Sequence, residues 1–315
     1  MYNLVLFTRS DWKLSSRLHT GALRGLSEYF NLTEISAPAH RIDTSQDEIV
    51  EKYKPDVVLC HAHAKGLIGY MKPFKCLKVM IAVDFFKRLW RKDLSFYDSN
   101  KFDITFQKHY IDKSLFGIKE NPIESVYLPW SADENDFKPD FDNWCNREKF
   151  ISLASNYKAD FYKERQLAIK TLNELHLIKD NDTTFDYSKQ NLLFNDDYIK
   201  FLKMFVGTLS SCETNSMYGK VFESIASGCV PLTPTFGCID LLFPYEKPIL
   251  YKKDCSDIVK QAKFIIDNPD EMYEKAQNLY RHYKENHTNK IRMKELSDNI
   301  INLLEGKEVI RKWGV

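Results

Sequence analysis

The sequence has almost no net charge, and this excludes partners that need a strong overall field. Its 45 Lys and Arg residues are balanced by 44 Asp and Glu residues, which leaves a net charge of +1 at pH 7. Proteins that bind nucleic acids or anionic membrane surfaces usually carry a marked excess of positive charge. We therefore expect no nucleic-acid partner, and we expect any charged ligand to be bound by a few local groups.

The sequence also lacks paired cysteines. Its seven Cys residues are odd in number and form no C-x-x-C pair, which argues against a disulfide framework. The run Cys60-His61-Ala62-His63 contains metal-ligand residue types, but it has no distant partners at a recognisable spacing. We expect reduced thiols, no metal site and a cytoplasmic protein.

Long apolar runs are absent as well. No stretch approaches the roughly 18 apolar residues of a membrane-spanning helix. The apolar run near the N-terminus, residues 4–7, is too short for a signal-peptide core. We expect a soluble chain without stable membrane insertion. With 43% hydrophobic and 28% charged residues over 315 positions, the chain is typical of a compact protein with two domains.

Short apolar runs alternate with helix-like segments over residues 1–130, which predicts βα units around a parallel sheet. Apolar residues recur at every fourth position from residue 18 to residue 30 and predict the first helix there. The expected strands cover residues 4–7, 57–60, 79–83, 104–106 and 126–128.

A Pro-bounded, acidic segment at residues 128–139 is suited to connect two domains. We therefore expect domains at residues 1–139 and 140–315. The alternation restarts in the second domain, with strands at 150–154, 207–210 and 230–233 and helices at 164–175 and 220–227. Beyond residue 254 the pattern is helical, and the last helices are able to pack back on the first domain.

Residues 212–232 carry the clearest chemical signal. Capping residues precede a predicted helix whose free backbone N–H groups would bind phosphate. Lys220 follows within about one turn, and Glu223 lies three residues later on the same face. A cation for a diphosphate and a carboxylate for ribose hydroxyls would then be neighbours. The alternative is an ordinary surface salt bridge on a capped helix, and the spacing fits both interpretations.

Residues 220–232, with the sequence KVFESIASGCVPL, resemble the nucleotide-sugar motif of GT-B glycosyltransferases. The branch they resemble is the group-1-like family that includes the CgeB spore-maturation proteins. Four further segments are similar to that family in the same order. They are residues 127–133 (YLPWSAD), Tyr162 with Arg165, residues 233–243 (TPTFGCIDLLF), and residues 286–288 (NHT) with Arg292.

The resemblance implies an α/β protein of the GT-B fold, in which two Rossmann-like domains with parallel sheets face a central cleft. The first domain would bind the acceptor and the second the nucleotide sugar. The implied reaction moves a hexosyl or related sugar from a nucleoside-diphosphate sugar to a hydroxyl of a glycan or small-molecule acceptor. Retention of the anomeric configuration is expected, without a metal ion or a cofactor other than the donor itself.

The resemblance also assigns roles to residues. Lys220 and Arg165 would stabilise charge on the departing diphosphate, and Glu223 would orient the ribose. Many retaining relatives carry Glu where this chain has Asn215, which weakens the transfer of that residue's role. The other expected donor-binding residues are Asn215, Ser216, Tyr218, Gly219 and Tyr162.

An inverting enzyme would need a base for the acceptor hydroxyl, and several strand ends of the first domain offer one. The candidates are Asp11, His61, His63 and Asp84. We take Asp84 as the catalytic candidate, with capping of the following helix as the alternative. Because a fold does not fix a function, a nucleotide-sugar epimerase and a non-catalytic nucleotide- or glycan-binding protein stay open as alternatives.

Overall fold

The computed structural model describes residues 1–9, 23–37, 44–61, 69–82, 99–110, 124–153, 163–180, 195–211 and 218–314. Contacts divide the chain into two units. The first unit comprises Met1–Pro129 and Asn289–Val315, and the second comprises Trp130–Thr288. The chain therefore changes unit after Pro129, earlier than the expected boundary at residue 139, and it returns to the first unit at Asn289.

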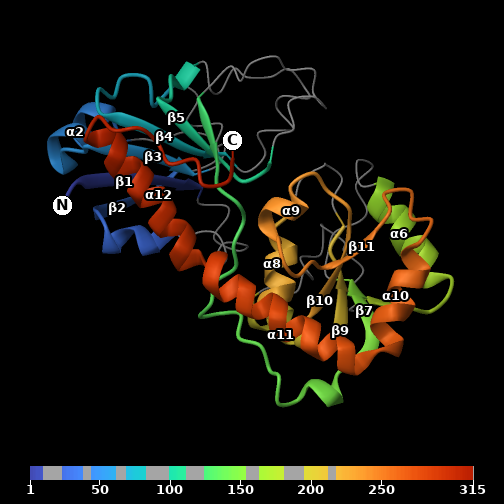
Figure 1. Cartoon of the computed structure of the whole chain (residues 1–315). Helices are drawn as coiled ribbons and strands as arrows, with labels where there is room; N and C mark the ends of the chain where they lie inside the picture. Colours follow the sequence, from blue (N-terminus) through green and yellow to red (C-terminus); the bar gives the residue numbers. More distant parts are fainter. Residues whose placement is uncertain are drawn as a thin grey trace. The chain divides into compact units, whose positions relative to one another are not determined.

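The first unit contains a six-stranded parallel sheet in the order β2-β1-β3-β4-β5-β6 (Figure 1). From β1 the chain adds β2 on one side of the sheet and β3 on the other. The carboxyl ends of β1 and β3 are therefore a topological switch point. The strands are β1 Asn3–Arg9, β2 Asn31–Ala37, β3 Val57–His61, β4 Leu77–Ala82, β5 Ile104–Gln107 and β6 Ser125–Tyr127.

Two apolar layers enclose this sheet because alternate residues of each strand point to opposite faces. Leu4 and Leu6 of β1 belong to the core formed with α12 (Asn289–Leu304) and the 3-10 helix η2 (Gly25–Glu28). Val5 and Phe7 belong to the opposite core, which contains α2 (Gln46–Tyr53). The helix that is last in sequence thus completes the core of the unit that is first.

The strands expected over residues 1–130 are all present, but β2 was not expected. Its sequence, NLTEISA, is rich in polar residues, as an edge strand of a sheet allows. The predicted helix before it is described from residue 23 onward, where it includes the short helix η2 and ends ahead of β2. Edge strands with one covered face give a weak apolar pattern, which explains the missed element.

The second unit contains a five-stranded parallel sheet in the order β11-β10-β9-β7-β8. Its strands are β7 Glu148–Leu153, β8 Ile178–Asp180, β9 Phe205–Leu209, β10 Val230–Pro234 and β11 Ile249–Tyr251. Its helices are η4 Trp144–Asn146, α6 Lys163–Asn173, α7 Asn195–Lys203, α8 Gly219–Ala226, α9 Ile239–Leu242, α10 Ile258–Asp267 and α11 Pro269–Asn286. Helices α6 and α10 lie on one side of the sheet and α8 on the other (Figure 1).

The C-terminal end of α8 is fixed by Arg147 and Gly228. The buried Arg147 guanidinium donates to the carbonyl oxygens of Ser227 and Gly228, each at 3.1 Å, and to that of Phe205 at 3.2 Å. Gly228 has a φ of +76°, and a Cβ there would lie 2.9 Å from Pro139. Glycine is therefore required at this turn, where it ends the helix and leads into β10.

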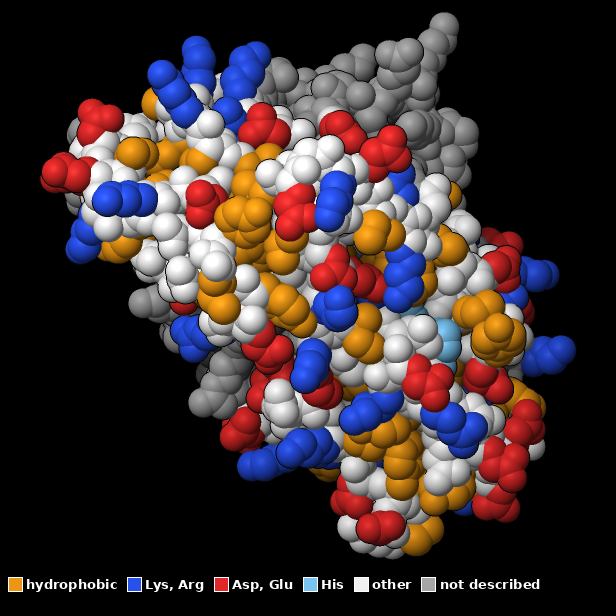
Figure 2. Space-filling model, turned by 60° about the vertical axis from the view of Figure 1, so that its left-hand side comes forward, with side chains coloured by type: hydrophobic (Ala, Val, Ile, Leu, Met, Phe, Trp, Pro, Cys, Tyr) orange, Lys and Arg blue, Asp and Glu red, His pale blue; other side chains and the backbone are white. Residues whose placement is uncertain are grey.

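The surface carries charges of both signs. Figure 2 shows Lys and Arg side chains intermixed with Asp and Glu side chains over most of the face drawn, in agreement with the small net charge. In the part of the chain that the structure describes, no helix is both long and apolar enough to cross a membrane.

Candidate functional site

The candidate site lies at the point in the second sheet where the order of successive strands reverses. Strands β7 and β9 are adjacent and parallel, yet the chain continues from β7 to β8 on one side and from β9 to β10 on the other. Ligands of open α/β sheets bind at such a switch point, outside the carboxyl ends of the strands. Helix α6 follows β7 and helix α8 follows β9, so both helices begin at this edge.

Arg165 connects the two sides of the switch point. It lies in the first turn of α6, and its Nε donates to the Ser211 hydroxyl at 2.7 Å. A second guanidinium nitrogen donates to the Ser211 carbonyl oxygen at 3.2 Å. Because Ser211 is the second residue beyond the end of β9, this buried cation is held at the edge where α8 begins.

Helix α8 presents two polar side chains at this edge. Six of its eight residues are buried, and the two that are not are Lys220 and Glu223. Their side chains retain 34% and 12% exposure. The pair is thus part of a largely buried helix, and its i, i+3 ion pair is compatible with both the donor site and the structural alternative.

Tyr198 of α7 joins these two side chains. Its hydroxyl donates to Glu223 Oε2 at 2.6 Å and accepts from Lys220 Nζ at 3.2 Å. Lys220 Nζ also lies 4.5 Å from the centre of the Tyr198 ring, a cation–π distance. The direct distance from Lys220 Nζ to Glu223 Oε2 is longer, at 3.9 Å. The three residues form one cluster at the start of α8.

Burial shifts the pKa values of Lys220 and Tyr198. It lowers the pKa of Lys220; Glu223 opposes that shift, and the positive charge of Arg165 adds to it. Burial, followed by the charge of Glu223, raises the pKa of Tyr198 well above its usual range, so the phenol stays protonated as a donor. Two cations that repel one another at a switch point are a favourable environment for a ligand with more than one negative charge.

The start of α8 is shaped by Tyr218 and Gly219. Tyr218 occupies the N-cap position with an extended backbone, and its side chain makes no capping hydrogen bond to the helix. A Cβ on Gly219 would lie 3.3 Å from the indole of Trp130, closer than most such contacts. Glycine therefore allows the Trp130 ring to pack against the first turn. Tyr218 and Gly219 directly precede Lys220 at this helix start, and their role in donor binding stays a prediction.

Several predicted residues lie outside the described part of the chain. These are Asp84, Asn215, Ser216 and Tyr162 from the expected sites, and Asp11 and His63 from the candidate bases. His61 is described: it is buried and is the last residue of β3, at the switch point of the first unit.

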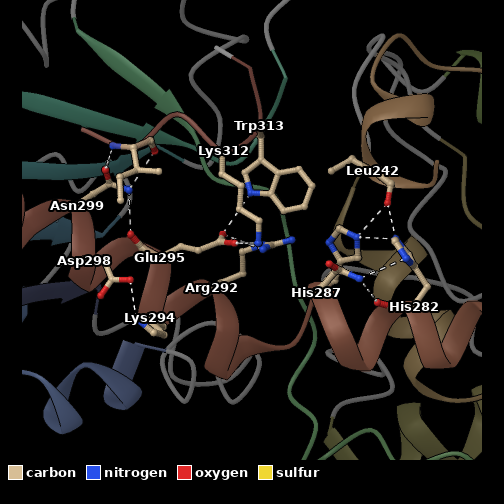
Figure 3. Close-up of polar contacts among 12 residues, drawn as sticks. Leu242, His282, His287, Arg292, Lys294, Glu295, Asp298, Asn299, Lys312 and Trp313 are labelled. Carbon is tan, nitrogen blue, oxygen red and sulfur yellow. Dashed lines mark hydrogen bonds and ion pairs between the residues drawn. The ribbon is translucent and has the colours of Figure 1, made fainter. Parts of the chain in front are cut away.

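Three of the segments that resemble one family, residues 220–232, 233–243 and 286–288, contact one another in the second unit. The ring of Phe222 from α8 stacks on Phe243 at 5.9 Å and on His287 at 4.7 Å. His282 and His287 each place Nε2 within hydrogen-bond distance of the Leu242 carbonyl oxygen, at 2.7 and 3.0 Å (Figure 3). These contacts hold the loop before β11 and the end of α11 against the buried face of α8.

Arg292 has a structural role in the first unit. It is fully buried in α12, and its guanidinium donates to Glu295 Oε2 at 2.8 Å (Figure 3). The Trp313 indole and the Lys312 ammonium donate to the same carboxylate. These interactions fix the residues after α12 against the helix.

Tyr198 is not among the residues expected at the site, because no helix was predicted over the residues of α7. The helix carried recognisable signals: Asp196 and Asp197 lie in its first turn and Lys200 and Lys203 in its last, as favoured by the helix dipole. Ser211 had no signal of its own, since its role depends on β7 and β9 being neighbours. Within the described residues, no group of three or more His, Cys, Asp or Glu side chains is arranged to hold a metal ion.

Residues 165–298 match the family described as glycosyl transferase-like, and this range includes Arg165, Tyr198, Lys220 and Glu223. No curated protein sequence matches the chain significantly.

Solved structures resemble the whole chain at low sequence identity. Sucrose-phosphate synthase from Thermosynechococcus elongatus gives a TM-score of 0.61 at 10% identity, over 98% of this chain and 100% of that one. A UDP-forming trehalose-phosphate synthase from Burkholderia xenovorans gives 0.58 at 10% identity, over 97% and 99%. An alpha-glucosyltransferase in complex with UDP-glucose and DNA gives 0.61 at 10% identity, over 95% and 99%.

The fold and the family match define the class of protein. It is a glycosyltransferase with the GT-B fold, built from two α/β units that each contain a parallel sheet. The predicted fold class and the predicted enzyme class are confirmed, and transfer of a sugar is the reaction to which the site must be fitted.

Proposed function

We propose that the protein transfers a sugar from a nucleoside-diphosphate sugar to a hydroxyl of a glycan or small-molecule acceptor, with retention of the anomeric configuration. The single observation that carries this proposal is the clustering of Arg165, Lys220 and Glu223 around the switch point of the second sheet. The motif resemblance to the family that includes the CgeB proteins supports the same donor class.

The three side chains fit the parts of such a donor. Lys220 and Arg165 are cations at the start of α8, where backbone N–H groups also favour an anion. As the bond between the sugar and the diphosphate breaks, negative charge grows on the diphosphate oxygens. Cations fixed beside that position stabilise the transition state more than the ground state. We assign Lys220 and Arg165 this role, and no metal ion is needed for it.

Glu223 has the opposite charge and a different partner. Its carboxylate can only accept hydrogen bonds when ionised, and the hydroxyls of ribose can donate them. It lies one turn further along α8 than Lys220, so a nucleotide whose diphosphate meets Lys220 would place its ribose near Glu223. The acceptor oxygen then forms the new bond to the anomeric carbon as the bond to the diphosphate oxygen breaks, and the hydroxyl proton passes to the departing diphosphate. A retaining reaction needs no separate base in the first unit.

The test is release of nucleoside diphosphate from a panel of nucleotide sugars by the purified protein. The panel begins with UDP-glucose, since two of the structural neighbours are named for uridine nucleotides. A transferase releases nucleoside diphosphate slowly by donor hydrolysis and faster with a suitable acceptor. NMR of the product then reads its anomeric configuration. Conversion of the sugar without release would favour an epimerase, and binding with neither reaction would favour a non-catalytic protein; either result overturns the proposal.

A further inference from the structure

We propose that Tyr198 is a positioning residue that orients Glu223 for the ribose hydroxyls. The inference rests on the proposed nucleotide site and extends it to a residue of α7. It starts from the contact of the Tyr198 hydroxyl with both side chains.

The direction of each hydrogen bond follows from the chemistry of the three groups. An ionised carboxylate only accepts, an ammonium only donates, and a phenol has one proton to donate and lone pairs with which to accept. Tyr198 must therefore donate to Glu223 and accept from Lys220. Both bonds involve a charged group, which makes them stronger than bonds between neutral groups. The hydroxyl has one orientation that satisfies both partners.

Packing fixes the ring that carries this hydroxyl. Tyr198 is only 7% exposed, and Phe137 packs edge-on against it at 6.3 Å between ring centres. A tyrosine that is held on several sides keeps its hydroxyl in place more accurately than an exposed residue would. Rigid support of this kind is what a binding side chain needs to be oriented before its ligand arrives.

The hydrogen bond from Tyr198 fixes the orientation of the Glu223 carboxylate. Tyr198 occupies Oε2, while Oε1 lies over the first residue of α8, 3.7 Å from where a Cβ on Gly219 would be. The carboxylate is thus turned with one oxygen toward α7 and the other toward the start of the helix. Oε1 is the oxygen that we assign to the ribose.

The contact with Tyr198 also leaves Lys220 able to bind another partner. Its Nζ is 3.9 Å from Glu223 Oε2, beyond hydrogen-bond distance, and it uses one N–H donor on the Tyr198 hydroxyl. An ammonium has three donors, so two are left for other partners such as phosphate oxygens. A diphosphate can then bind Lys220 without first breaking a hydrogen bond between Lys220 and Glu223.

The test is Tyr198→Phe, which removes the hydroxyl and keeps the ring. We expect the Kd of a ribonucleoside diphosphate to rise about tenfold or more, as is usual for loss of a hydrogen bond to a charged group. The Kd of the matching 2′,3′-dideoxynucleoside diphosphate should change much less. The ratio of the two Kd values, measured by calorimetry, is the readout, because a merely structural role would raise both values equally.

The matched control is Tyr283→Phe. Tyr283 of α11 is also a buried tyrosine of the second unit, and its hydroxyl donates to the Ala132 carbonyl oxygen at 2.8 Å. We expect this variant to lose stability and to keep the wild-type ratio of Kd values. In the double variant with Glu223→Gln, Tyr198→Phe should have little further effect on the ratio, since its action passes through Glu223.

The outcomes separate this inference from the proposed function. A wild-type protein that binds ribose and dideoxyribose nucleotides equally, or binds neither, contradicts the ribose site itself. A wild-type protein that discriminates, together with a folded Tyr198→Phe variant that keeps the same ratio, overturns the role of Tyr198 alone. If Tyr198→Phe gives no folded protein, Tyr198→Met replaces it, with the same expectation and the same overturning result.

Discussion

Lys220 and Glu223 lie three residues apart on α8, but the hydroxyl of Tyr198 joins their charged groups at 3.2 and 2.6 Å while the direct separation is 3.9 Å. The ammonium is therefore restrained without being neutralised by a close ion pair. This distinction matters for function, because a lysine in a close pair would have to exchange a carboxylate for the phosphate of a ligand.

Replacement of Lys220 by alanine should lower turnover by about a hundredfold or more, because a cation directed at a leaving group acts mainly in the transition state. Steady-state kinetics with the active donor measures the effect, and circular dichroism checks the fold. The control is Lys200→Ala, which removes an α7 lysine that is 76% exposed and paired with Asp197 three residues earlier. Normal turnover in folded Lys220→Ala would exclude Lys220 from the reaction.

Glu223→Gln should weaken ribonucleotide binding without removing the phosphate contacts. The amide keeps the size of the side chain but loses the charge that strengthens its hydrogen bonds to hydroxyls. We expect the Kd of the nucleoside diphosphate to rise about tenfold, while that of inorganic pyrophosphate stays nearly constant. An equal loss of affinity for both ligands would place Glu223 at the phosphates instead of the ribose.

The reaction should not depend on a divalent metal ion. In the proposed site, Lys220 and Arg165 would supply the positive charge that a metal ion provides in other transferases, and the backbone N–H groups of the first turn of α8 would add to it. Initial rates in EDTA should therefore equal those in buffer alone. Loss of activity in EDTA that Mg²⁺ or Mn²⁺ restores would contradict this prediction.

Arg147→Met should destabilise the second unit by on the order of 3 kcal/mol, since it removes the side-chain donor of the Ser227 and Gly228 carbonyl oxygens and one of the two side-chain donors of the Phe205 carbonyl oxygen. Urea unfolding measures the change. Arg281→Met, which replaces an exposed arginine of α11, is the control and should change stability by less than about 0.5 kcal/mol. A similar small change for both variants would mean that water replaces the Arg147 contacts.

The sequence predicted α8 and its two polar residues because the signals are local. A run of apolar residues at helical spacing, a glycine at its end and an apolar strand after it all fall within residues 219–234. Lys220 and Glu223 are also close in sequence, so helix geometry alone puts them on one face. Sequence signals of this kind do not depend on how the rest of the chain folds.

The contacts that complete the site could not be predicted in this way. Arg165 and Ser211 meet because β7 and β9 are neighbours in the sheet, and strand order depends on the packing of the whole unit. Tyr198 meets Glu223 across 25 positions for the same reason. The pattern beyond residue 254 likewise predicted helices that are able to pack on the first domain, but it did not specify that α12 completes the core beneath β1 through Leu296 and Ile300.

The last prediction concerns Lys108, the residue after β5. Burial, reinforced by the positive charge of Arg292 and opposed by Glu295, lowers its pKa to about 7. In the unfolded chain the same lysine titrates near 10.4. Between these two values the folded protein holds the neutral amine while the unfolded chain still binds the proton. The contribution of Lys108 to stability therefore rises with pH from about 7 to about 10, by about 1.4 kcal/mol per unit, and is flat below pH 7.

Lys108→Met removes this dependence, because methionine does not titrate. The free energy of unfolding of the wild type should therefore increase relative to that of the variant as the pH rises from 7 to 9. Between pH 5 and 6 the difference between the two should be constant. Urea unfolding across this range measures it. Lys294→Met is the control: the pKa of that exposed lysine is raised by Asp298, so its difference from the wild type should be constant over the same range. A constant difference for Lys108→Met as well would mean that Lys108 stays charged in the folded protein, with its ammonium solvated or paired well enough to offset burial.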